Sequence, residues 1–224
     1  MKKTLYHGSK DIIEHPIFGE GNPGNDYGLG FYCTENLELA LEWAVDKNRD
    51  GYANEYEIEL DDLKILNLND TKYNILNWLT ILLHNRIFNV KGEIANYAKD
   101  YLIDNFSISY KEYDVIIGHR ADDSYFTFAK DFINNGISYE KLSRVMRLGN
   151  LGEQFVLMSE KAFKRIKYVK SHYADANIYY RKKNDRDIAA RKEYLDHRKN
   201  IRVKGQLYMN QILDEEIKNG DPRL

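Results

Sequence analysis

The sequence predicts an α+β fold in which short strands are spread among helices. In residues 55–60 (EYEIEL) glutamate alternates with apolar residues, which is typical of a strand with one face in water. In residues 37–44 leucine and alanine recur at helical spacing. The strand and helix signals do not follow a regular βαβ rhythm, and this argues against a doubly wound parallel sheet.

Loop residues separate the elements of the first half of the chain. The stretch 18–30 is rich in glycine and predicts a long loop. We expect a strand over 4–7 before this loop and a strand over 31–33 directly after it. A helix opened by Glu35 or Asn36 follows, and then a strand over 56–60 that continues over 65–68. Helices over 72–85 and 92–105 come last in this half.

A second buried strand is expected in the other half of the chain. Residues 113–117 (YDVII) are apolar enough for it, and Gly118 and the polar loop 119–123 end it. After this loop we expect helices over 125–134 and 139–147, a strand over 153–159, and a short helix beginning near Glu160.

The bulk composition is that of an ordinary globular chain. Of 224 residues, 43% are hydrophobic and 30% are charged, and the net charge of −2 carries no nucleic-acid signature. Cys33 is the only cysteine, which excludes an internal disulfide and a multi-cysteine zinc site and suits a reducing cytoplasm. We find no signal-peptide pattern and no apolar run that could span a bilayer. We therefore expect a cytoplasmic protein without a membrane partner or a metal.

A basic segment follows the last expected strand. Residues 181–204 are crowded with lysine and arginine and hold few large aliphatic residues, which predicts an exposed helical extension. Gly205 separates this extension from a last amphipathic helix near 207–217. The segment either recruits a nucleic acid or an acidic protein such as an antitoxin, or is a solvated helix with weak surface ion pairs.

Two motifs near the N-terminus hold residue types that suit a nucleotide. Residues 6–9 (YHGS) offer a histidine that can bond a ribose hydroxyl and a glycine that lets a ligand amide approach the backbone. They are equally consistent with a strand end and a turn. Residues 28–34 (GLGFYCT) are not a Walker loop, because no Gly-Lys follows them. They are not a dinucleotide fingerprint either, because the third glycine is missing.

Later aromatic and polar residues admit two interpretations each. Tyr32 and Trp43 are an aromatic pair able to sandwich a flat ring, or are core residues. Glu153 and Gln154 begin an apolar strand, where polar residues serve a site or face water. Strand alternation places Gln154 on one face with Val156 and Glu153 on the other.

Taken in order, these motifs resemble the ADP-ribosyltransferase superfamily, in the His-Tyr-Glu branch that includes the poly-ADP-ribose polymerases and diphtheria-type toxins. LYHGS, DYGLGFYCTENLELALEWA, YDVIIGHRADDSY and GEQFVLMSEKAFKRIKYV further resemble an uncharacterised bacterial family of ADP-ribosyltransferase-like, toxin-type domains. The resemblance implies a split antiparallel β-sheet core with surrounding helices. Residues 1–170 would form the NAD-binding domain, and residues 171–224 would form a basic, mostly helical C-terminal extension.

The resemblance also implies roles for single residues. His7 would bind the ribose next to adenine, the backbone of Gly8 would meet the nicotinamide amide, and Tyr32 would stack on the nicotinamide. Trp43 stands where the superfamily has a second aromatic, and Gln154 stands at the catalytic position, where the best-known transferases carry glutamate. The implied catalytic residues are Gln154, Tyr32 and His7, and the implied NAD contacts are His7, Gly8, Ser9, Tyr32, Thr34, Trp43 and Arg120.

The loop 119–123 supplies the last of these residues. Because it follows a buried strand, it lies at a sheet end, and Arg120 could contact the NAD pyrophosphate or an acceptor. Asp122 or Asp123 would instead cap the following helix.

Three functions compete under this resemblance. The first is an NAD-dependent ADP-ribosyltransferase, a toxin or defence effector that moves ADP-ribose onto a protein or nucleic acid. The second is an NAD glycohydrolase, and the third is a catalytically weak NAD-binding or interaction module. In each of them NAD is the substrate or ligand and no metal is needed. Gln154 can hold a ribose hydroxyl but supplies no charge, which costs about 2–4 kcal/mol of barrier.

Overall fold

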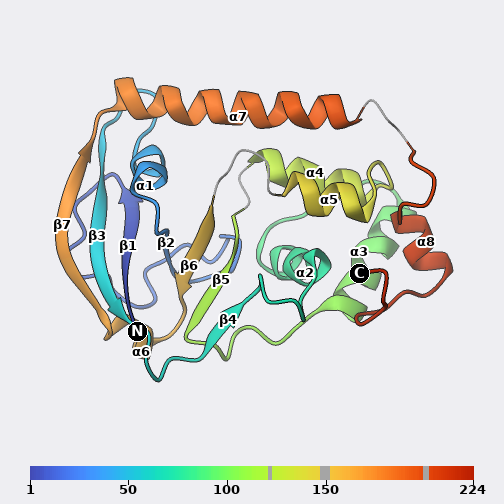
Figure 1. The fold of residues 1–224 in the computed structure, drawn as a ribbon, viewed down its shortest axis with the longest axis horizontal. Coiled ribbons are helices and arrows are strands. Elements are labelled where there is room, and N and C mark those ends of the chain that lie inside the picture. Colours follow the sequence, from blue (N-terminus) through green and yellow to red (C-terminus); the bar gives the residue numbers. More distant parts are fainter. Residues whose placement is uncertain (121–122, 147–151, 199–201) are drawn as a thin grey trace.

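The fold is that of a computed structural model, which describes residues 1–120, 123–146, 152–198 and 202–224. It is a mixed α+β protein with two sheets, so the expected class is confirmed. Figure 1 shows the smaller sheet at one end, the larger sheet in the middle, and most helices beyond it.

The smaller sheet is antiparallel, with the strand order β1-β3-β7. Its strands are β1 (Lys2–Ser9), β3 (Gly51–Glu59) and β7 (Ile166–Ala174). β3 is the expected alternating strand, extended at its N-terminal end. β7 is not predicted from the sequence, because its side chains are mostly exposed or half-buried and charged residues interrupt its alternation.

The larger sheet has the order β2-β6-β5-β4. Its strands are β2 (Phe31–Cys33), β6 (Glu153–Leu157), β5 (Val115–His119) and β4 (Ile65–Asn67). β2 has the predicted bounds. β4 pairs with β5 in parallel, so this sheet is mixed, and the expectation of an antiparallel core is wrong here. The physical reason is the long helical crossover between these strands, which returns the chain in the same direction.

Eight helices complete the described part of the chain. They are α1 (Leu37–Ala44), α2 (Ile75–Asn85), α3 (Glu93–Phe106), α4 (Asp123–Ile133), α5 (Tyr139–Val145), α6 (Glu160–Phe163), α7 (Ala176–Arg198) and α8 (Met209–Asp214). Asn36 is the N-cap of α1, where its side chain accepts a hydrogen bond from the Leu39 amide, as the sequence signal predicts. None of the described helices is long and apolar enough to cross a membrane.

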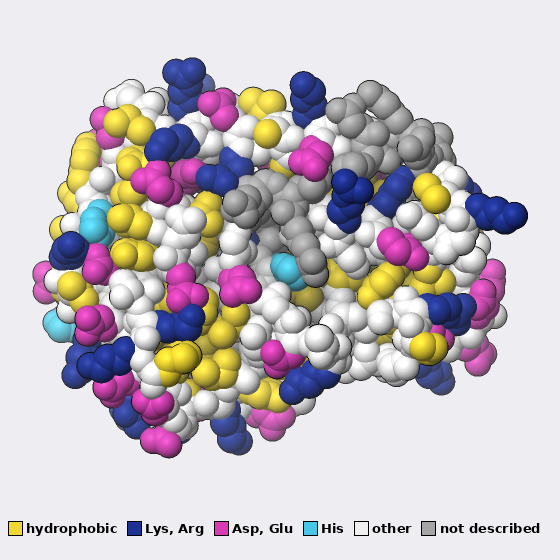
Figure 2. Space-filling model, in the orientation of Figure 1, with side chains coloured by type: hydrophobic (Ala, Val, Ile, Leu, Met, Phe, Trp, Pro, Cys, Tyr) yellow, Lys and Arg dark blue, Asp and Glu magenta, His cyan; other side chains and the backbone are white. Residues whose placement is uncertain are grey.

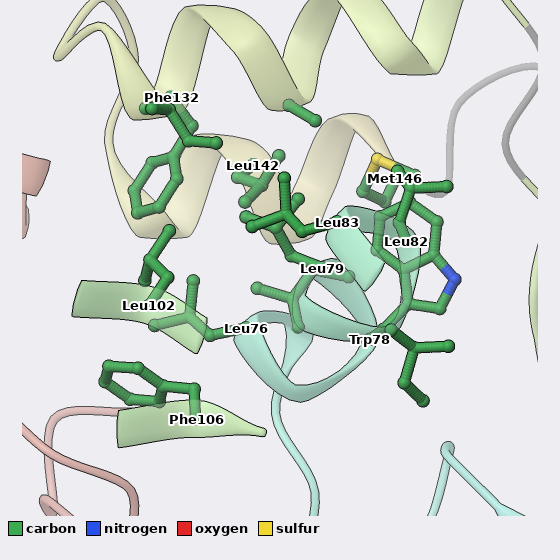
Figure 3. Packing of buried hydrophobic residues seen from close by; sticks show 14 of the residues in the cluster. Leu76, Trp78, Leu79, Leu82, Leu83, Leu102, Phe106, Phe132, Leu142 and Met146 are labelled. Carbon is green, nitrogen blue, oxygen red and sulfur yellow. The ribbon is translucent and has the colours of Figure 1, made fainter. Parts of the chain in front are cut away.

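Two cores lie on opposite faces of the larger sheet. On one face, side chains of both sheets meet around Leu5, Tyr56 and Phe155. On the other face the sheet packs against the helical half, and Figure 3 shows leucines of α2 between Phe106 of α3 and Phe132 of α4. Cross-strand neighbours share a face, so each strand of the larger sheet serves both cores.

Candidate functional site

Within the described residues, one pair joins the backbones of the two sheets. The Tyr6 amide donates to the Thr34 carbonyl at 2.8 Å, and the Thr34 amide donates to the Tyr6 carbonyl at 2.9 Å. Continuing the register of Cys33 and Phe155 by one residue sets Thr34 beside Gln154. The sequence-predicted motifs of β1, β2 and β6 therefore converge on this junction.

Beyond this junction β1 continues without a neighbour on the β2 side. Because both backbone groups of Tyr6 face Thr34, strand alternation turns the N–H and C=O of Gly8 toward the same edge. No hydrogen bond between described residues outside the regular elements uses these two groups. An N–H and a C=O side by side on an open strand edge match a carboxamide, which offers one acceptor and two donors.

Helix α1 packs on the face of the smaller sheet at Gly8. A Cβ atom on Gly8 would collide with the Ala40 carbonyl oxygen and would come within 2.9 Å of the Trp43 Cβ. Only glycine allows the helix to lie so close, and the close approach places the Cβ of Trp43 against the Gly8 backbone. The juxtaposition of Gly8 and Trp43 that the sequence suggests is thus present in the fold.

The cationic side chain of Arg120 lies over the Trp43 ring. The Arg120 guanidinium carbon lies 4.1 Å from the ring centroid, which is a cation–π arrangement. The indole nitrogen of Trp43 is buried and has no hydrogen-bond partner among the described residues. Arg120 directly follows β5, so the expectation that the loop after this strand reaches the sheet end is confirmed for this residue.

Gln154 is buried in β6 with an unsatisfied oxygen. Its side chain is 5% exposed, and its Oε1 atom has no hydrogen-bond partner in the described parts of the chain. It pairs with Gly118 of β5 and shares a face with Val156, as alternation predicts. A buried carbonyl without a donor costs about 1–3 kcal/mol, so such an atom is a candidate ligand contact.

Glu153 does not share this position. It is exposed, and its Oε1 accepts a hydrogen bond from the Asn69 side chain at 2.7 Å. The Glu153 carboxylate is therefore engaged at the surface and does not share the buried position of Gln154.

His7 is neutral and has a defined tautomer. Burial lowers the pKa of its imidazole, and the hydrogen bond to the Tyr32 carbonyl opposes this only in part. Its Nδ1 lies 2.7 Å from that carbonyl oxygen, which can only accept, so Nδ1 carries the proton. Nε2 is left as an acceptor for a hydroxyl donor. The His7 imidazole stacks on the Phe31 ring, with 4.3 Å between the two ring centroids.

The Tyr32 hydroxyl holds its own loop. It donates to the Gly28 carbonyl at 2.6 Å and accepts from the Tyr27 amide at 3.1 Å. Burial raises the pKa of the Tyr32 phenol far above its usual range. The Tyr32 ring is partly buried and packs against the core of the helical half. This agrees in part with the interpretation of Tyr32 as a core residue.

Ser9 and Thr34 use their hydroxyls within the protein. Ser9 Oγ donates to the Asp11 carbonyl at 2.5 Å and accepts from Asn54 at 2.9 Å. Thr34 Oγ1 accepts from the Asn36 amide at 3.2 Å, just before α1. Both residues shape the backbone around the junction.

A cavity of about 360 Å³ lies next to His7 and Tyr32. The loop 13–22 and Phe163 supply much of its lining. Its size is at the lower end for small-molecule sites. A larger cavity of about 1050 Å³ opens between α2, α5 and the C-terminal residues, and none of the sequence-predicted site residues lines it.

Other candidates are settled only in part. Asp122 lies outside the described residues and so does the side chain of Asp123, which leaves their capping role a prediction. Cys33 is buried, and burial raises the pKa of its thiol, so it is no nucleophile. No three His, Cys, Asp or Glu side chains are grouped for a metal within the described ranges.

Sequence reasoning missed the residues that support the site. Glu42 of α1 is almost fully buried and pairs with Arg186 of α7. Asn54 of β3 is fully buried and bonds the Ser9 hydroxyl and the Asp11 carbonyl. Glu42 lies on the polar side of the helix signal, opposite Leu37, Ala40, Leu41 and Ala44, so the sequence gives no sign of its burial.

Comparisons with known proteins give a family but no function. A family model described as "Protein of unknown function (DUF3990)" matches residues 3–168. No curated protein and no solved structure matches the chain.

Proposed function

This chain belongs to the DUF3990 family, and we propose that it is an NAD-dependent ADP-ribosyltransferase whose site is the junction of the two sheets. The two sheets joined by the Tyr6–Thr34 bridge are compatible with the split sheet of an ADP-ribosyltransferase-like fold.

The open edge of β1 at Gly8 carries the proposal. Its N–H and C=O face the side where no strand follows and have no partner among the described residues, and the Cβ of Trp43 lies against Gly8. A nicotinamide carboxamide would complete the edge as a partner strand does, with its ring close to the indole. The glycine is required because α1 leaves no room for a side chain.

The remaining residues fit the rest of the dinucleotide. Nε2 of the neutral His7 would accept a hydrogen bond from a ribose hydroxyl. Arg120 would pair with the pyrophosphate, a role for which its planar, permanently charged fork is suited. Gln154 Oε1, which has no described partner, would accept the 2′-hydroxyl of the nicotinamide ribose.

The reaction breaks the bond between C1′ of the ribose and the nicotinamide nitrogen. The bonding electron pair leaves with nicotinamide, which becomes neutral, and positive charge spreads over C1′ and the ring oxygen. An acceptor oxygen or nitrogen then bonds to C1′ and gives up its proton. Gln154 would orient the ribose during this step, and the partial negative charge of its amide oxygen would stabilise the cation weakly.

One observation favours a second function. The buried residue at the catalytic position is a neutral amide, and no carboxylate among the described side chains takes its place. This favours slow NAD hydrolysis or NAD binding without turnover as the alternative. A toxin or defence role, with an antitoxin as partner, remains part of the first proposal.

Nicotinamide release by the purified protein tests the proposal. We expect release with NAD and a saturable heat of binding in calorimetric titration. Release without labelling of any acceptor would favour the glycohydrolase. Binding without release would favour the NAD-binding module, and absence of both would refute the proposed site.

A further inference from the structure

Helix α7 touches α1, which carries Trp43, and α4, which begins three residues after Arg120. Trp43 lies near the end of α1, and Arg120 lies just before α4. α7 contacts α1 and α4, and Figure 1 shows it running along one side of the molecule from the smaller sheet to the helical half. The helix therefore connects the two supports whose side chains meet in the site.

The contact with α1 is a buried ion pair. Arg186 donates from Nε to Glu42 Oε2 at 3.0 Å and from Nη2 to Glu42 Oε1 at 2.8 Å. The Glu42 side chain is 3% exposed, and that of Arg186 is 28% exposed. A two-point pair fixes both distance and orientation, and a buried carboxylate that lost its partner would be strongly unfavourable. Glu42 directly precedes Trp43 in the chain.

Two further cations of α7 hold the same helix. Lys182 pairs with Glu38 at 2.6 Å. Lys183 donates to the Val45 carbonyl at 3.3 Å, at the C-terminal end of α1, where a cation also complements the helix dipole. These basic residues are therefore engaged inside the protein.

The contact with α4 is aromatic. Tyr194 is buried and stacks on Phe128 with ring centroids 3.9 Å apart, and its hydroxyl donates to Asp131. Phe128 and Asp131 lie in α4, on the same segment that the loop of Arg120 enters. α7 therefore packs at two places, on α1, which carries Trp43, and on α4, which follows Arg120 in the chain.

We propose that α7 is a positioning element of the NAD site, in which Arg186 fixes the place of α1 and thereby holds the Trp43 ring against the Arg120 guanidinium. Arg186 does not touch NAD and acts through Glu42. What the positioned ring binds rests on the proposed function, whereas the positioning itself does not. The basic segment, expected either to recruit a partner or to be a solvated helix, would then shape the site.

The experiment reads the position of Trp43 directly. The chain has two tryptophans, so a Trp78→Phe background leaves Trp43 as the only indole emitter. In this background Arg186→Lys keeps the charge but loses the two-point geometry. Glu42→Met/Arg186→Met replaces both partners by apolar side chains and avoids an unpaired buried charge. Arg181→Met, on the exposed side of the same helix, is the matched control, since its side chain is 84% exposed and pairs only loosely with Asp185.

Both test variants are expected to show stronger acrylamide quenching of Trp43 than the background protein, with unchanged far-ultraviolet circular dichroism. The Kd for NAD should rise roughly 10-fold to 100-fold, the scale of losing one aromatic stacking contact, while turnover of bound NAD changes far less. The Arg181→Met control should change neither quantity.

Two results would overturn the positioning role. One is background-level quenching in both test variants, and the other is an equal change in the Arg181→Met control. If no protein in the set binds NAD but quenching still follows the Glu42–Arg186 pair, the proposed function fails and the positioning role stands.

Discussion

The Arg120 guanidinium lies over the indole ring of Trp43, 4.1 Å from its centroid. One residue follows a strand of the larger sheet, and the other ends the helix that closes over β1. The guanidinium is a flat cation, and so is the pyridinium ring of NAD. A ring that already holds one flat cation on one face is chemically suited to the other.

Arg120→Ala is expected to raise the Kd for NAD by roughly tenfold or more, because a charge-assisted contact to pyrophosphate is worth about 1.5–3 kcal/mol. Calorimetric titration with ADP-ribose and with nicotinamide separates the contacts: only ADP-ribose should lose affinity. Arg120→Lys, which keeps the charge, is the control and should lose less. Normal NAD kinetics together with normal acceptor labelling in Arg120→Ala would remove Arg120 from the site.

Tyr32→Ala is expected to weaken NAD binding by about 1–3 kcal/mol, the scale of aromatic stacking on a base. Tyr32→Phe is the matched control, because it keeps the ring and removes the hydroxyl that bonds Gly28 and Tyr27. The phenylalanine variant should bind NAD nearly normally and lose about 1 kcal/mol of stability. Calorimetry and urea unfolding measure the two effects, and unchanged affinity in a folded Tyr32→Ala protein would disprove the stacking role.

Gln154→Met should lower turnover while leaving the melting temperature nearly unchanged, because its Oε1 makes no described hydrogen bond that could be lost. Gln154→Glu should raise nicotinamide release, by at most roughly two to three powers of ten, since the negative charge of the carboxylate would stabilise the developing cation. Glu153→Gln, one residue away and exposed, is the control. Wild-type rates in both Gln154 variants would make the residue structural.

A pH-dependent part of the stability should come from His7. Burial lowers the pKa of its imidazole in the folded state, so below about pH 6.5 the unfolded chain binds more protons than the folded one. The free energy of unfolding contributed by this residue is therefore complete above that pH and declines as the pH falls. His7→Asn, which keeps a donor for the Tyr32 carbonyl, should flatten the decline.

Urea unfolding between pH 5 and pH 8 measures the effect as the difference between wild type and His7→Asn, which cancels the other histidines. His84→Asn, at an exposed position, is the control and should leave the slope as it is. An identical slope in the His7 variant would show that the imidazole titrates normally.

The exposed face of α7 remains a proposed surface for the acceptor or an antitoxin. Figure 2 shows Lys and Arg side chains among acidic and hydrophobic ones along the upper edge, where α7 lies. Arg181→Glu/Lys192→Glu should keep nicotinamide release and lose acceptor labelling. Labelling of the natural target at the wild-type rate would leave this face without a role in recognition.

Deleting the extension after Val169 is a poor substitute for this test. β7 runs from Ile166 to Ala174, and its pairing with β3 would be cut in two. The deletion would also remove α7, and with it Arg186, the ion-pair partner of Glu42. We expect such a fragment to unfold.

The sequence by itself determined the local elements and the order of the motifs. β2 has the predicted bounds, and the expected strands over 56–60 and 113–117 are present because alternation and apolar runs are local properties of the chain. The position of Gln154 on the face of Val156 also follows from alternation alone. β7 escaped prediction because an edge strand with many exposed side chains carries no such pattern.

Only the tertiary structure decided which of these residues meet. The parallel pairing of β4 with β5, the stacking of Arg120 on Trp43 and the pairing of Glu42 with Arg186 all join segments far apart in the chain. The tertiary structure also turned the hydroxyls of Ser9 and Thr34 inward and left the Gln154 oxygen without a described partner. Local patterns report which face of an element is buried, but contact partners depend on the packing of the whole chain.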